Sequence, residues 1–480
     1  MKLAQLLEGI EYRLVGVDPE CDIPSLCYNS LQAEPGCMFV AIRGFKTNGH
    51  KYIPSAFERG AAVAVVEEIP EGFDKPCIVV SDSRKALAML AANFFDHPER
   101  KVPVIGVTGT NGKTTVTNLV KEILERSGKK CGLIGTNGNM IGDLFLPTER
   151  TTPESFELFR IFADMVEAGC DVIIMEVSSH SLVLDRVYGI EFHSAMFTNL
   201  TQDHLDFHIT MEEYARAKAM LFSRCAHSVV NIDDPWASVM LGGSCEDHKT
   251  FSAKDPAADY YASNIELGIS GISFDLTAEG ETLPVHLGIP GMFSVYNALT
   301  AIGCCRSLGL ELREVLHSLS MAHGVKGRAQ VVPTGTDYTV LLDYAHTPDG
   351  VENILKAARG FAKGRVIALF GCGGDRDRTK RPIMGKIAGS LADHCVVTSD
   401  NPRSEEPMAI IRDILPGVEE TGCSFDMIED RREAIRHALS MGRAGDVIVF
   451  MGKGHEDYQE INGVKHHLDE YEEVMKYFGK

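Results

Sequence analysis

Short apolar runs alternate with longer amphipathic stretches through the middle of the chain. The runs have strand length, whereas the stretches repeat apolar residues at helical spacing. Strands that alternate with helices in this way predict βαβ units and a mostly parallel sheet covered on both faces, hence an α/β fold. The expected strands are 102–107, 131–135, 171–177, 194–200 and 228–233, and the expected helices are 116–128 and 155–169.

The pattern changes at two places and divides the chain into three parts. Apolar runs at 37–42, 61–66 and 77–80 give the N-terminal part the pattern of a small α/β unit. A stretch near 250–290 has the residue alternation and turn signals of an antiparallel β excursion, and a third series of strands begins after Gln330. We therefore expect an N-terminal domain at 1–98, a central domain at 99–332 and a C-terminal domain at 333–480.

Composition narrows the class of protein. A chain of 480 residues exceeds what one hydrophobic core usually supports, and 44% apolar with 24% charged residues is ordinary for a soluble globular protein. The 67 acidic residues outnumber the 47 basic ones, which argues against a general nucleic-acid or anionic membrane surface. Thirteen scattered cysteines without a C-x-x-C pair suit reduced thiols better than disulfides or a zinc site. With no signal cleavage site and no apolar run of about 20 residues, we expect a cytosolic protein.

The strongest chemical motif is the stretch 102–119, VPVIGVTGTNGKTTVTNL. A strand aims the glycine-bearing turn, and the helix that follows presents unpaired N–H groups and the positive end of its dipole to an anion. Lys113 adds a charge for terminal phosphates, and Thr114 adds a hydroxyl suited to Mg²⁺. The common phosphate loop would need glycine at Val107, so TGTNGKTT is a distinct subtype. We expect ATP as the ligand; the simpler alternative is a tight turn that binds nothing.

Further polar residues follow the next strands, where doubly wound sheets place their sites. Glu176 can hold Mg²⁺ directly or through water, although an acidic residue at a strand end is often merely solvated. His204 and His208 are four residues apart, but Leu205 replaces the glutamate of zinc proteases, so we expect His204 near a metal–phosphate centre. From the sequence alone, Lys218 is interpreted as a solvent-exposed helical lysine.

Several motifs follow one another in order along nearly the whole chain. They are TGTNGKTT, EVSSH, TNLTQDHLDFH, the helical lysine after it, Tyr296-Asn297, Gly327-Arg328 and DYAHTPD. In this order they resemble the Mur ligase family, which comprises cytoplasmic ATP-dependent amide ligases of peptidoglycan precursor assembly. The strings GCGGDRD, DNPR and GKGHE resemble the members that add meso-2,6-diaminopimelate to UDP-N-acetylmuramoyl-L-alanyl-D-glutamate.

The resemblance implies three domains: one for the UDP end of the substrate, a central phosphate-loop ATPase and a C-terminal Rossmann-like domain. It implies ligation through an acyl phosphate with ATP and Mg²⁺. Separately, we expect a monomer whose partners are small molecules, with no nucleic acid and no membrane insertion. Lys218 aligns with a lysine that family members carry as a carbamate, N6-carboxylysine, which is an anionic oxygen ligand for Mg²⁺. The implied catalytic residues are Lys113, Glu176, His204 and Lys218, and the implied metal ligands are Thr114, Glu176, His204 and carbamylated Lys218.

The resemblance also assigns three sets of binding residues. Those for ATP are Gly109, Thr110, Asn111, Gly112, Lys113, Thr114, Thr115, Asn297, Arg328, Asp343 and His346. Those for the UDP-N-acetylmuramoyl-dipeptide are Ser30, Phe45, Lys46, Thr47, Thr151, Thr152, Ser178 and Arg186. Those for diaminopimelate are Arg376, Asp400, Asn401, Pro402, Arg403, Gly452 and Glu456. Arg403 offers a planar, bidentate partner for the distal carboxylate, while Gly452 and Glu456 would hold the distal ammonium.

Two departures and two other functions remain open on the sequence. YNSL at 28–31 stands where relatives often read Asp-Ser-Arg, and Leu184 occupies a position that can be a polar substrate contact. Folylpolyglutamate synthase shares the ATPase core, but the N-terminal domain and the DNPR and GKGHE strings speak against it. A nucleotide-switch ATPase needs only the phosphate loop and its Mg²⁺ residues, and it leaves Lys218 and the third-domain loops unexplained.

Overall fold

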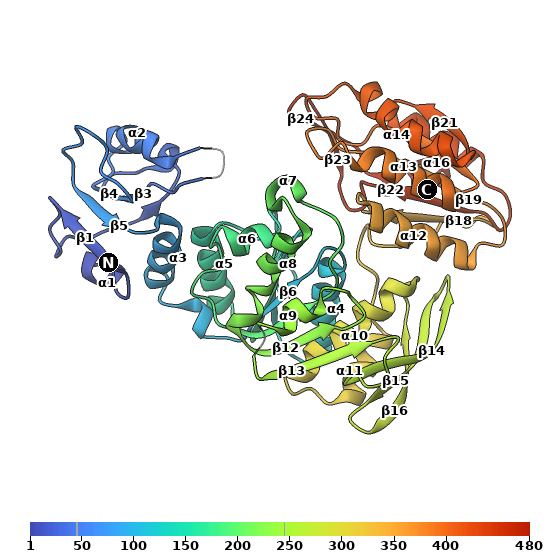
Figure 1. Ribbon diagram of the computed structural model, residues 1–480, viewed down its shortest axis with the longest axis horizontal. Coiled ribbons are helices and arrows are strands. Elements are labelled where there is room, and N and C mark those ends of the chain that lie inside the picture. Colours follow the sequence, from blue (N-terminus) through green and yellow to red (C-terminus); the bar gives the residue numbers. More distant parts are fainter. Residues whose placement is uncertain (45–46, 244) are drawn as a thin grey trace.

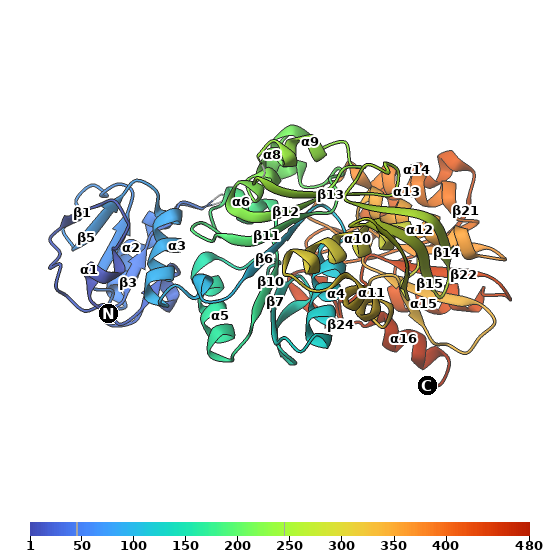
Figure 2. The ribbon, with the colours of Figure 1, turned by 90° about the horizontal axis from the view of Figure 1, so that it is seen from below.

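Three large sheets follow one another along the computed structural model, which describes residues 1–44, 47–243 and 245–480. The N-terminal unit stands at one end, and the C-terminal unit lies against the central one (Figures 1 and 2). The predicted α/β fold is confirmed, and all thirteen cysteines carry thiols rather than disulfides. Within the described ranges, no helix has the length and apolarity needed to cross a membrane. Phe45 and Lys46, two predicted substrate-binding residues, lie outside the described residues.

The N-terminal unit is built on a five-stranded sheet of order β1-β5-β4-β3-β2. From β2 to β5 each strand pairs in parallel with the next, and β1 pairs antiparallel with β5. Val63 and Val65 pack on one face and Ala64 and Val66 on the other, because successive strand residues point to opposite faces. The elements are β1 (Tyr12–Val15), β2 (Leu26–Cys27), β3 (Met38–Val40), β4 (Val63–Val66), β5 (Cys77–Val80), α1 (Leu3–Leu6), α2 (Ile53–Glu58) and α3 (Ser83–Phe94), with the short 3-10 helices η1 (Ser30–Gln32), η2 (Gly49–Tyr52) and η3 (Pro98–Arg100).

The central unit holds an eleven-stranded sheet of order β16-β15-β14-β13-β12-β11-β6-β10-β7-β8-β9. The strands from β14 to β7 in this order are parallel, and antiparallel strands extend both edges. The antiparallel excursion expected near 250–290 is therefore confirmed. The strands are β6 (Val104–Thr108), β7 (Cys131–Gly135), β8 (Gly138–Ile141), β9 (Leu144–Leu146), β10 (Val172–Glu176), β11 (Phe192–Phe197), β12 (Cys225–Asn231), β13 (Asp247–Ser252), β14 (Tyr260–Gly268), β15 (Gly271–Ala278) and β16 (Glu281–Leu287).

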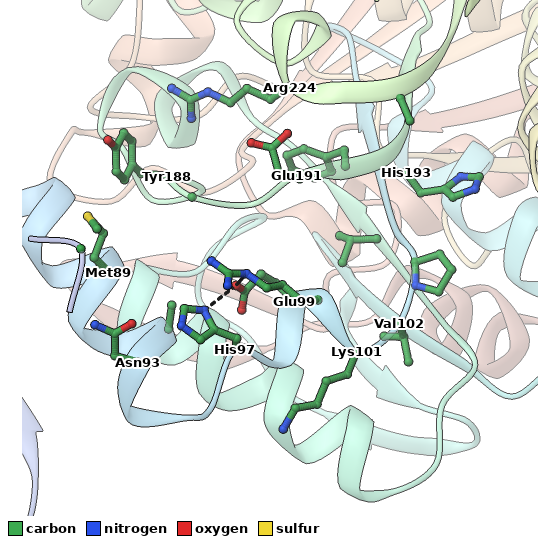
Figure 3. Close-up of a pocket in the computed structure, with 18 of the residues that line it drawn as sticks. Met89, Asn93, His97, Glu99, Lys101, Val102, Tyr188, Glu191, His193 and Arg224 are labelled. Atoms are coloured by element: carbon green, nitrogen blue, oxygen red, sulfur yellow. Dashed lines mark hydrogen bonds and ion pairs between the residues drawn. The ribbon is translucent and has the colours of Figure 1, made fainter. Parts of the chain in front are cut away.

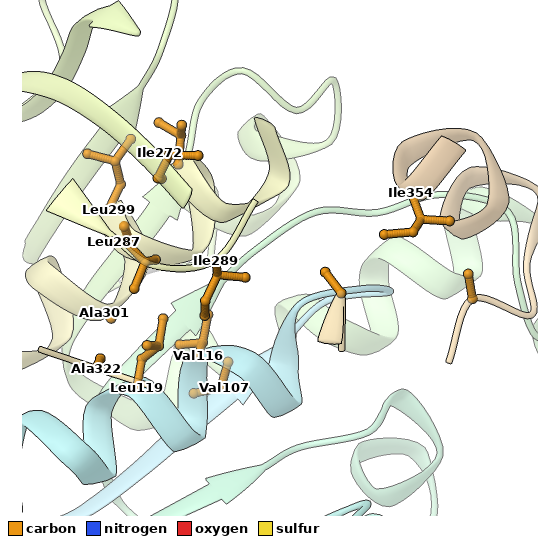
Figure 4. Packing of buried hydrophobic residues seen from close by; sticks show 14 of the residues in the cluster. Val107, Val116, Leu119, Ile272, Leu287, Ile289, Leu299, Ala301, Ala322 and Ile354 are labelled. Atoms are coloured by element: carbon orange, nitrogen blue, oxygen red, sulfur yellow. The ribbon is translucent and has the colours of Figure 1, made fainter. Parts of the chain in front are cut away.

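Helices cover both faces of this sheet. Their packing sets the orientation of α4, the first helix of the central unit. Val107 of β6 lies in the same buried cluster as α4, α10 and α11, whereas Val104 lies in the cluster of α5 and α8. Val116 and Leu119 project from α4 toward the segment of Ile289 (Figure 4). This apolar stripe fixes α4, so that its N-terminus meets the loop after β6. The helices are α4 (Lys113–Arg126), α5 (Ser155–Glu167), α6 (Ser179–Val183), α7 (Leu205–His208), α8 (Met211–Ala219), η4 (Phe222–Arg224), α9 (Ala237–Leu241), α10 (Met292–Ser307) and α11 (Leu312–Ser320).

The C-terminal unit has a six-stranded sheet of order β17-β18-β22-β19-β20-β21, parallel except for β17. Leu341 packs with α12 to α14, whereas Val340 and Leu342 pack with α15 and α16, so this sheet is also covered on both faces. The predicted boundary at 332 falls directly after β17, a strand of this third sheet. The elements are β17 (Gln330–Val332), β18 (Thr339–Asp343), α12 (Pro348–Phe361), β19 (Val366–Phe370), α13 (Lys380–Leu391), β20 (His394–Thr398), α14 (Pro407–Thr421), β21 (Ser424–Ile428), α15 (Arg431–Ser440), β22 (Val447–Met451), the hairpin β23 (Tyr458–Ile461) and β24 (Val464–His467), and α16 (Glu470–Tyr477).

Polar contacts join the N-terminal and central units. The hydroxyl of Tyr28 donates to Glu157 Oε2 at 2.9 Å, and Arg84 Nη1 donates to Glu154 Oε1 and to the Leu184 carbonyl, each at 3.2 Å. A cavity of about 930 Å³ lies at the same junction, between α3, the linker around η3 and the segment before β11 (Figure 3). No described residue of the predicted sites lines this cavity, so it is separate from the chemistry followed below.

Candidate active site

The loop between β6 and α4 is held by the segment that follows β11. The Asn199 carbonyl accepts a hydrogen bond from the Thr110 N–H at 2.8 Å, and the Asn199 side chain accepts one from the Asn111 N–H at 3.0 Å. The Thr198 hydroxyl donates to the Asn111 carbonyl at 2.6 Å. Gly109 has φ +149°, and a Cβ there would overlap Thr198 Oγ1. The loop therefore requires glycine at this position, and its shape is fixed before any ligand arrives.

Two lysines converge on this loop from different elements. Lys113 Nζ donates to the carbonyls of Gly109 and Thr110, both at 2.9 Å, and Lys218 Nζ donates to the Gly109 carbonyl at 2.8 Å. Burial lowers the pKa of both lysines, that of Lys218 further because Lys113 repels it. Lys218 is only 1% exposed and faces the Tyr214 ring, so the expectation of a solvent-exposed lysine was wrong. Tyr214 and Ala215 on the same helix lie in the buried core, and Lys218 reaches the loop from that helix.

Glu176 lies at the end of β10, beside the loop. It is 1% exposed, and its two oxygens accept hydrogen bonds from the N–H and the hydroxyl of Thr136, at 3.0 and 2.9 Å. The Thr136 hydroxyl also contacts that of Thr151 at 3.0 Å. The charge of Glu176 acts on the ammonium of Lys113 and favours its protonated form. A carboxylate oriented in this way, next to the loop, is suited to a cation that accompanies phosphate.

His204 and His208 do not share one helix face. His204 precedes α7 with a left-handed φ of +54°, whereas His208 ends that helix and meets the Ser179 hydroxyl with Nε2 at 2.8 Å. Both rings lie next to His180, with centroids 4.9 and 5.5 Å away. The His204 side chain is half exposed, and its Nε2 lies 3.4 Å from Asp203. His204 therefore lies at the accessible edge of this histidine group, whereas His208 lies in the core.

Residues predicted to bind ATP meet around a cavity of about 300 Å³ between the central and C-terminal units. The phosphate loop reaches the C-terminal unit directly, because Asn111 Nδ2 donates to Asp349 Oδ2 at 2.6 Å. Arg328 Nη2 donates to the Thr114 hydroxyl at 3.1 Å and lies over the Tyr344 ring. Both oxygens of Asp343 accept backbone N–H groups, so this carboxylate also shapes the turn. Seven of the eleven predicted residues line the cavity: Asn111, Gly112, Thr115, Asn297, Arg328, Asp343 and His346.

The residues predicted to bind the UDP-linked substrate fall into two groups. Thr152 joins one group: its hydroxyl donates to the Glu176 carbonyl at 2.8 Å and accepts from the Ser178 N–H at 3.1 Å, and its carbonyl accepts from Arg186 Nη1 at 3.1 Å. Thr151 adjoins this group through Thr136. Ser30 and Thr47 belong to the N-terminal unit instead, where Ser30 is buried and Thr47 is exposed. The structure therefore brings the central residues together and leaves these two on a neighbouring unit.

The residues predicted to bind diaminopimelate cluster after β20 and β22. A Cβ on Gly452 would overlap Asp400 Oδ2, so the two loops are in close contact. Burial opposes ionisation of Asp400, but Lys453 and Arg431 outweigh it and hold its pKa below the usual value. Arg403 has φ +51°; its Nη1 donates to the Gly374 carbonyl at 2.9 Å, and its Nε lies 3.4 Å from Glu460 Oε2. The loop is thus fastened to the β23–β24 hairpin.

The other residues of this set lie beside Arg403 and Asp400. Arg376 is exposed, and its Nη1 donates to the Asp375 carbonyl at 3.1 Å. Pro402 is buried, and Asn401 Nδ2 donates to Glu456 Oε2 at 2.8 Å. Arginines and carboxylates therefore lie in one polar cluster, a combination that suits a ligand with both a carboxylate and an ammonium.

The side chains around the phosphate loop include oxygen donors for the implied Mg²⁺. No three His, Cys, Asp or Glu side chains form a metal-binding group in the described part of the chain. Mg²⁺ held together with a nucleotide takes one or two carboxylates, and substrate phosphates and water complete its shell. Glu176, buried at the end of β10, and Thr114, in the first turn of α4, offer a carboxylate and a hydroxyl that fit that requirement. Lys218 is a donor to Gly109 in its amine form and becomes a metal ligand only as a carbamate.

Sequence reasoning missed four residues that the structure brings to these sites. Asn199 holds the phosphate loop, Asp349 connects it to the C-terminal unit, and Asp203 lies beside His204. Lys453 is fully buried between Asn401 and Glu456. Asn199 and Asp203 stand in the TNLTQDH motif and Lys453 in GKGHE, so the motifs themselves were the available signal. Asp349 ends the DYAHTPD motif, although that motif does not indicate a contact with Asn111, 238 residues away.

Three family models match the chain in order. They are the catalytic domain of the Mur ligase family over residues 22–95, the Mur ligase middle domain over 107–305 and the Mur ligase glutamate ligase domain over 327–454. A solved structure of a UDP-N-acetylmuramoyl-L-alanyl-D-glutamate–2,6-diaminopimelate ligase matches with a TM-score of 0.72 at 31% identity, over 100% of this chain and 99% of that chain. Mycobacterium tuberculosis folylpolyglutamate synthase, complexed with ADP and AMPPCP, shares the fold with a TM-score of 0.66 at 17% identity, over 82% of this chain and 95% of that chain.

Two curated relatives cover the whole length. The one from Caldanaerobacter subterraneus subsp. tengcongensis is 48% identical over 478 residues, 99% of this chain and 98% of its own. The one from Clostridium acetobutylicum is 46% identical over 480 residues, 99% of each chain. Both are named as UDP-N-acetylmuramoyl-L-alanyl-D-glutamate–2,6-diaminopimelate ligases. The resemblance expected from the motifs is confirmed: this chain belongs to the Mur ligase family.

Proposed function

We propose that this protein is an ATP-dependent ligase that adds meso-2,6-diaminopimelate to UDP-N-acetylmuramoyl-L-alanyl-D-glutamate through an acyl phosphate. The reaction belongs to cytoplasmic peptidoglycan precursor synthesis and so contributes to cell-wall formation, cell shape and division. Full-length identity of 46–48% to relatives named for this reaction supports the proposal most directly. Independent support comes from the phosphate loop, which contacts the C-terminal unit, and from the polar cluster after β20 and β22 that includes Arg403 and Glu456.

Each unit has one task in this proposal. The N-terminal unit, residues 1–98, binds the UDP end with Ser30, Phe45, Lys46 and Thr47. The central unit, 99–332, binds ATP and the dipeptide end, and the C-terminal unit, 333–480, supplies the amino acid and closes the nucleotide site with Asp343 and His346. A monomer is sufficient, because one chain provides all three parts. Closure of the units also excludes water from the acyl phosphate, which water would otherwise hydrolyse.

The chemistry is phosphoryl transfer followed by amide formation. A carboxylate oxygen of the D-glutamyl residue attacks the γ-phosphorus of ATP, the bond from that phosphorus to the β–γ bridging oxygen breaks, and ADP leaves. The uncharged amine of the amino acid then attacks the acyl carbon, phosphate departs, and the amine gives up a proton. Lys113, at the start of α4, would neutralise the β- and γ-phosphate oxygens as charge moves between them. The protein therefore acts mainly by positioning the groups and neutralising their charge.

Mg²⁺ would be held by Thr114 and Glu176 at one position and by His204 and carbamylated Lys218 at a second. Bound there, it would neutralise phosphate charge during transfer. Carbamylation joins the Lys218 nitrogen to the carbon of CO₂ and releases a proton, so it requires the uncharged amine. Burial favours that form, because it lowers the pKa of Lys218 well below the usual value. The modification would also remove a positive charge next to Lys113.

The choice of amino acid rests on the pocket after β20. Diaminopimelate has a distal carboxylate and a distal ammonium, and lysine lacks that carboxylate. Arg403 would bind the carboxylate in a bidentate manner, and Glu456 would accept the ammonium. The proposed diaminopimelate site also includes Arg376, Asp400 and Gly452.

The decisive experiment measures phosphate release from ATP by the purified chain with UDP-N-acetylmuramoyl-L-Ala-D-Glu and a panel of amino acids. We expect release that depends on both substrates and is fastest with meso-diaminopimelate. Release that ignored both substrates would favour a regulatory ATPase instead. A preference for L-lysine would reject the role of Arg403, and use of a folate substrate would favour the folylpolyglutamate reading, for which the 17% identity shows the fold alone.

A further inference from the structure

Lys453 is a fully buried lysine in the loop after β22, with 0% of its surface exposed. Its Nζ donates to Asn401 Oδ1 and to Glu456 Oε2, both at 2.8 Å, and lies 5.2 Å from the centre of the Tyr458 ring. An ammonium removed from water is costly unless it is paired and hydrogen-bonded. Lys453 meets this requirement with two residues of the proposed amino-acid pocket.

Lys453 and the Glu460 N–H together determine which way the Asn401 amide points. The Asn401 oxygen accepts from Lys453 and also from the Glu460 N–H at 2.9 Å. Both of these partners are donors, so the oxygen must face them and the NH₂ group must face the other way. There Asn401 Nδ2 donates to Glu456 Oε2 at 2.8 Å. The amide is therefore fixed in one orientation.

The same contacts orient the carboxylate of Glu456. Its Oε2 accepts hydrogen bonds from Lys453 Nζ and Asn401 Nδ2. Its Oε1 accepts a longer one from the Tyr344 hydroxyl, at 3.4 Å. Oε1 thus keeps acceptor capacity for a further donor. An ammonium group of a ligand is a donor of that kind and carries the complementary charge.

We propose that Lys453 is a positioning residue of the amino-acid pocket. It holds Asn401 and Glu456 so that Glu456 Oε1 receives the distal ammonium of a diamino acid, and it does not itself contact the substrate. This inference rests on the proposed function, which the wild-type chain tests first. If the wild type ligates a different amino acid, the proposed function is wrong. The role of Lys453 can then still be tested by measuring the KM for that amino acid.

The test compares Lys453→Met with wild type by KM for each substrate. Losing a hydrogen bond to a charged group in the pocket should raise the KM for diaminopimelate by about 10- to 100-fold. The KM values for ATP and for the UDP-linked dipeptide should change less than about twofold, within the usual spread for sites that share no contact. Lys121→Met is the matched control, because Lys121 is 7% exposed and pairs with Glu125 on α4. It should leave the KM for diaminopimelate unchanged.

Two further variants separate positioning from general stability. In a Glu456→Gln background, Lys453→Met should raise the KM for diaminopimelate much less than in wild type, because its effect passes through Glu456. Lys453→Gln keeps a buried donor and replaces Lys453→Met if that variant does not fold. An equal rise in all three KM values, an unchanged KM for diaminopimelate or full additivity with Glu456→Gln would each overturn the proposal.

Discussion

Lys113 and Lys218 donate hydrogen bonds to the same oxygen, the carbonyl of Gly109, at 2.9 and 2.8 Å. One lysine begins the helix after the phosphate loop, and the other lies 105 residues further along the chain, on α8. Two ammonium groups this close repel each other, and burial strengthens the repulsion because water does not screen it. The pair therefore favours an arriving phosphate at Lys113 and an uncharged or carbamylated Lys218.

Lys218→Ala is expected to lower kcat by about 10²- to 10³-fold or more, the scale for removing one charge-stabilising group from an active site. Acetate or another short carboxylate should restore part of the activity, since it can occupy the space of the carbamate. The measurement is the phosphate-release assay with and without added carboxylate. Lys121→Ala, which removes another buried lysine, should keep near-normal activity. Full activity of Lys218→Ala would remove the carbamate from the mechanism.

Gly109→Ala is expected to disrupt the phosphate loop, because a Cβ would overlap Thr198 Oγ1 and the φ of +149° strains any L side chain. Nucleotide affinity measured by calorimetry should fall by at least about tenfold, a cost of about 1.4 kcal/mol. Gly360→Ala on α12 meets no atom within 4 Å and should bind nucleotide normally. Equal affinities of the two variants would contradict a fixed loop.

Asp349→Ala is expected to weaken the contact between the phosphate loop and the C-terminal unit. It removes the partner of Asn111 Nδ2, a hydrogen bond worth about 1–3 kcal/mol because one side is charged. Small-angle scattering in the presence of ATP should report a more extended chain, and kcat should fall. Glu352→Ala serves as the control, because the ion pair that Glu352 forms in the described part of the chain is with Lys356 on the same helix. Identical scattering curves would show that the contact does not hold the units together.

Arg403→Ala is expected to lose affinity chiefly for diaminopimelate. Removing one partner of a hydrogen-bonded charge pair between protein and substrate costs about 2–5 kcal/mol, so the KM should rise by more than about tenfold. Steady-state kinetics with each substrate varied in turn measures this effect. Arg412, an exposed arginine on α14, provides the matched Arg412→Ala control. An unchanged KM for diaminopimelate in the Arg403 variant would reject its assignment to the distal carboxylate.

Glu405 should make the C-terminal unit sensitive to acid. Hydrogen bonds from Arg381 lower its pKa from 4.5 to about 2. Because the folded pKa lies below the unfolded one, the stabilisation is complete above pH 4.5 and is lost as the pH falls toward 2. Glu405→Gln should therefore be less stable than wild type at pH 7, and the difference should shrink below pH 4.5.

Urea unfolding at pH 7, 5, 4 and 3 measures that difference. Glu420→Gln is the control, because Glu420 forms an ion pair with Lys386 in which both side chains are exposed. It should follow the wild-type pH dependence. A constant gap between Glu405→Gln and wild type over the whole range would contradict the lowered pKa.

Most of the fold could be predicted from local pattern. The alternation around β6 and α4 indicated a strand, a turn and a helix, and the structure has them at Val104–Thr108 and Lys113–Arg126. The antiparallel excursion was visible because strands that bury one face leave alternating residues. The boundary of the third unit was harder to place. The three residues of β17 do not show to which sheet this strand belongs, because that depends on its pairing with β18.

The features of the candidate site likewise fall into those predictable from local sequence and those that depend on tertiary structure. The sequence by itself determined the family and placed the phosphate loop, Glu176 and the DNPR loop after their strands, because these depend on residue types at fixed short spacing; the roles of those residues stay predictions. Only the tertiary structure decided that Lys218 is buried against Gly109, that Asn111 meets Asp349 and that Lys453 lies between Asn401 and Glu456. These partners are separated by up to 238 residues. Burial and charge pairing arise when distant segments pack together, and a local pattern of polar and apolar residues does not specify which segments those will be.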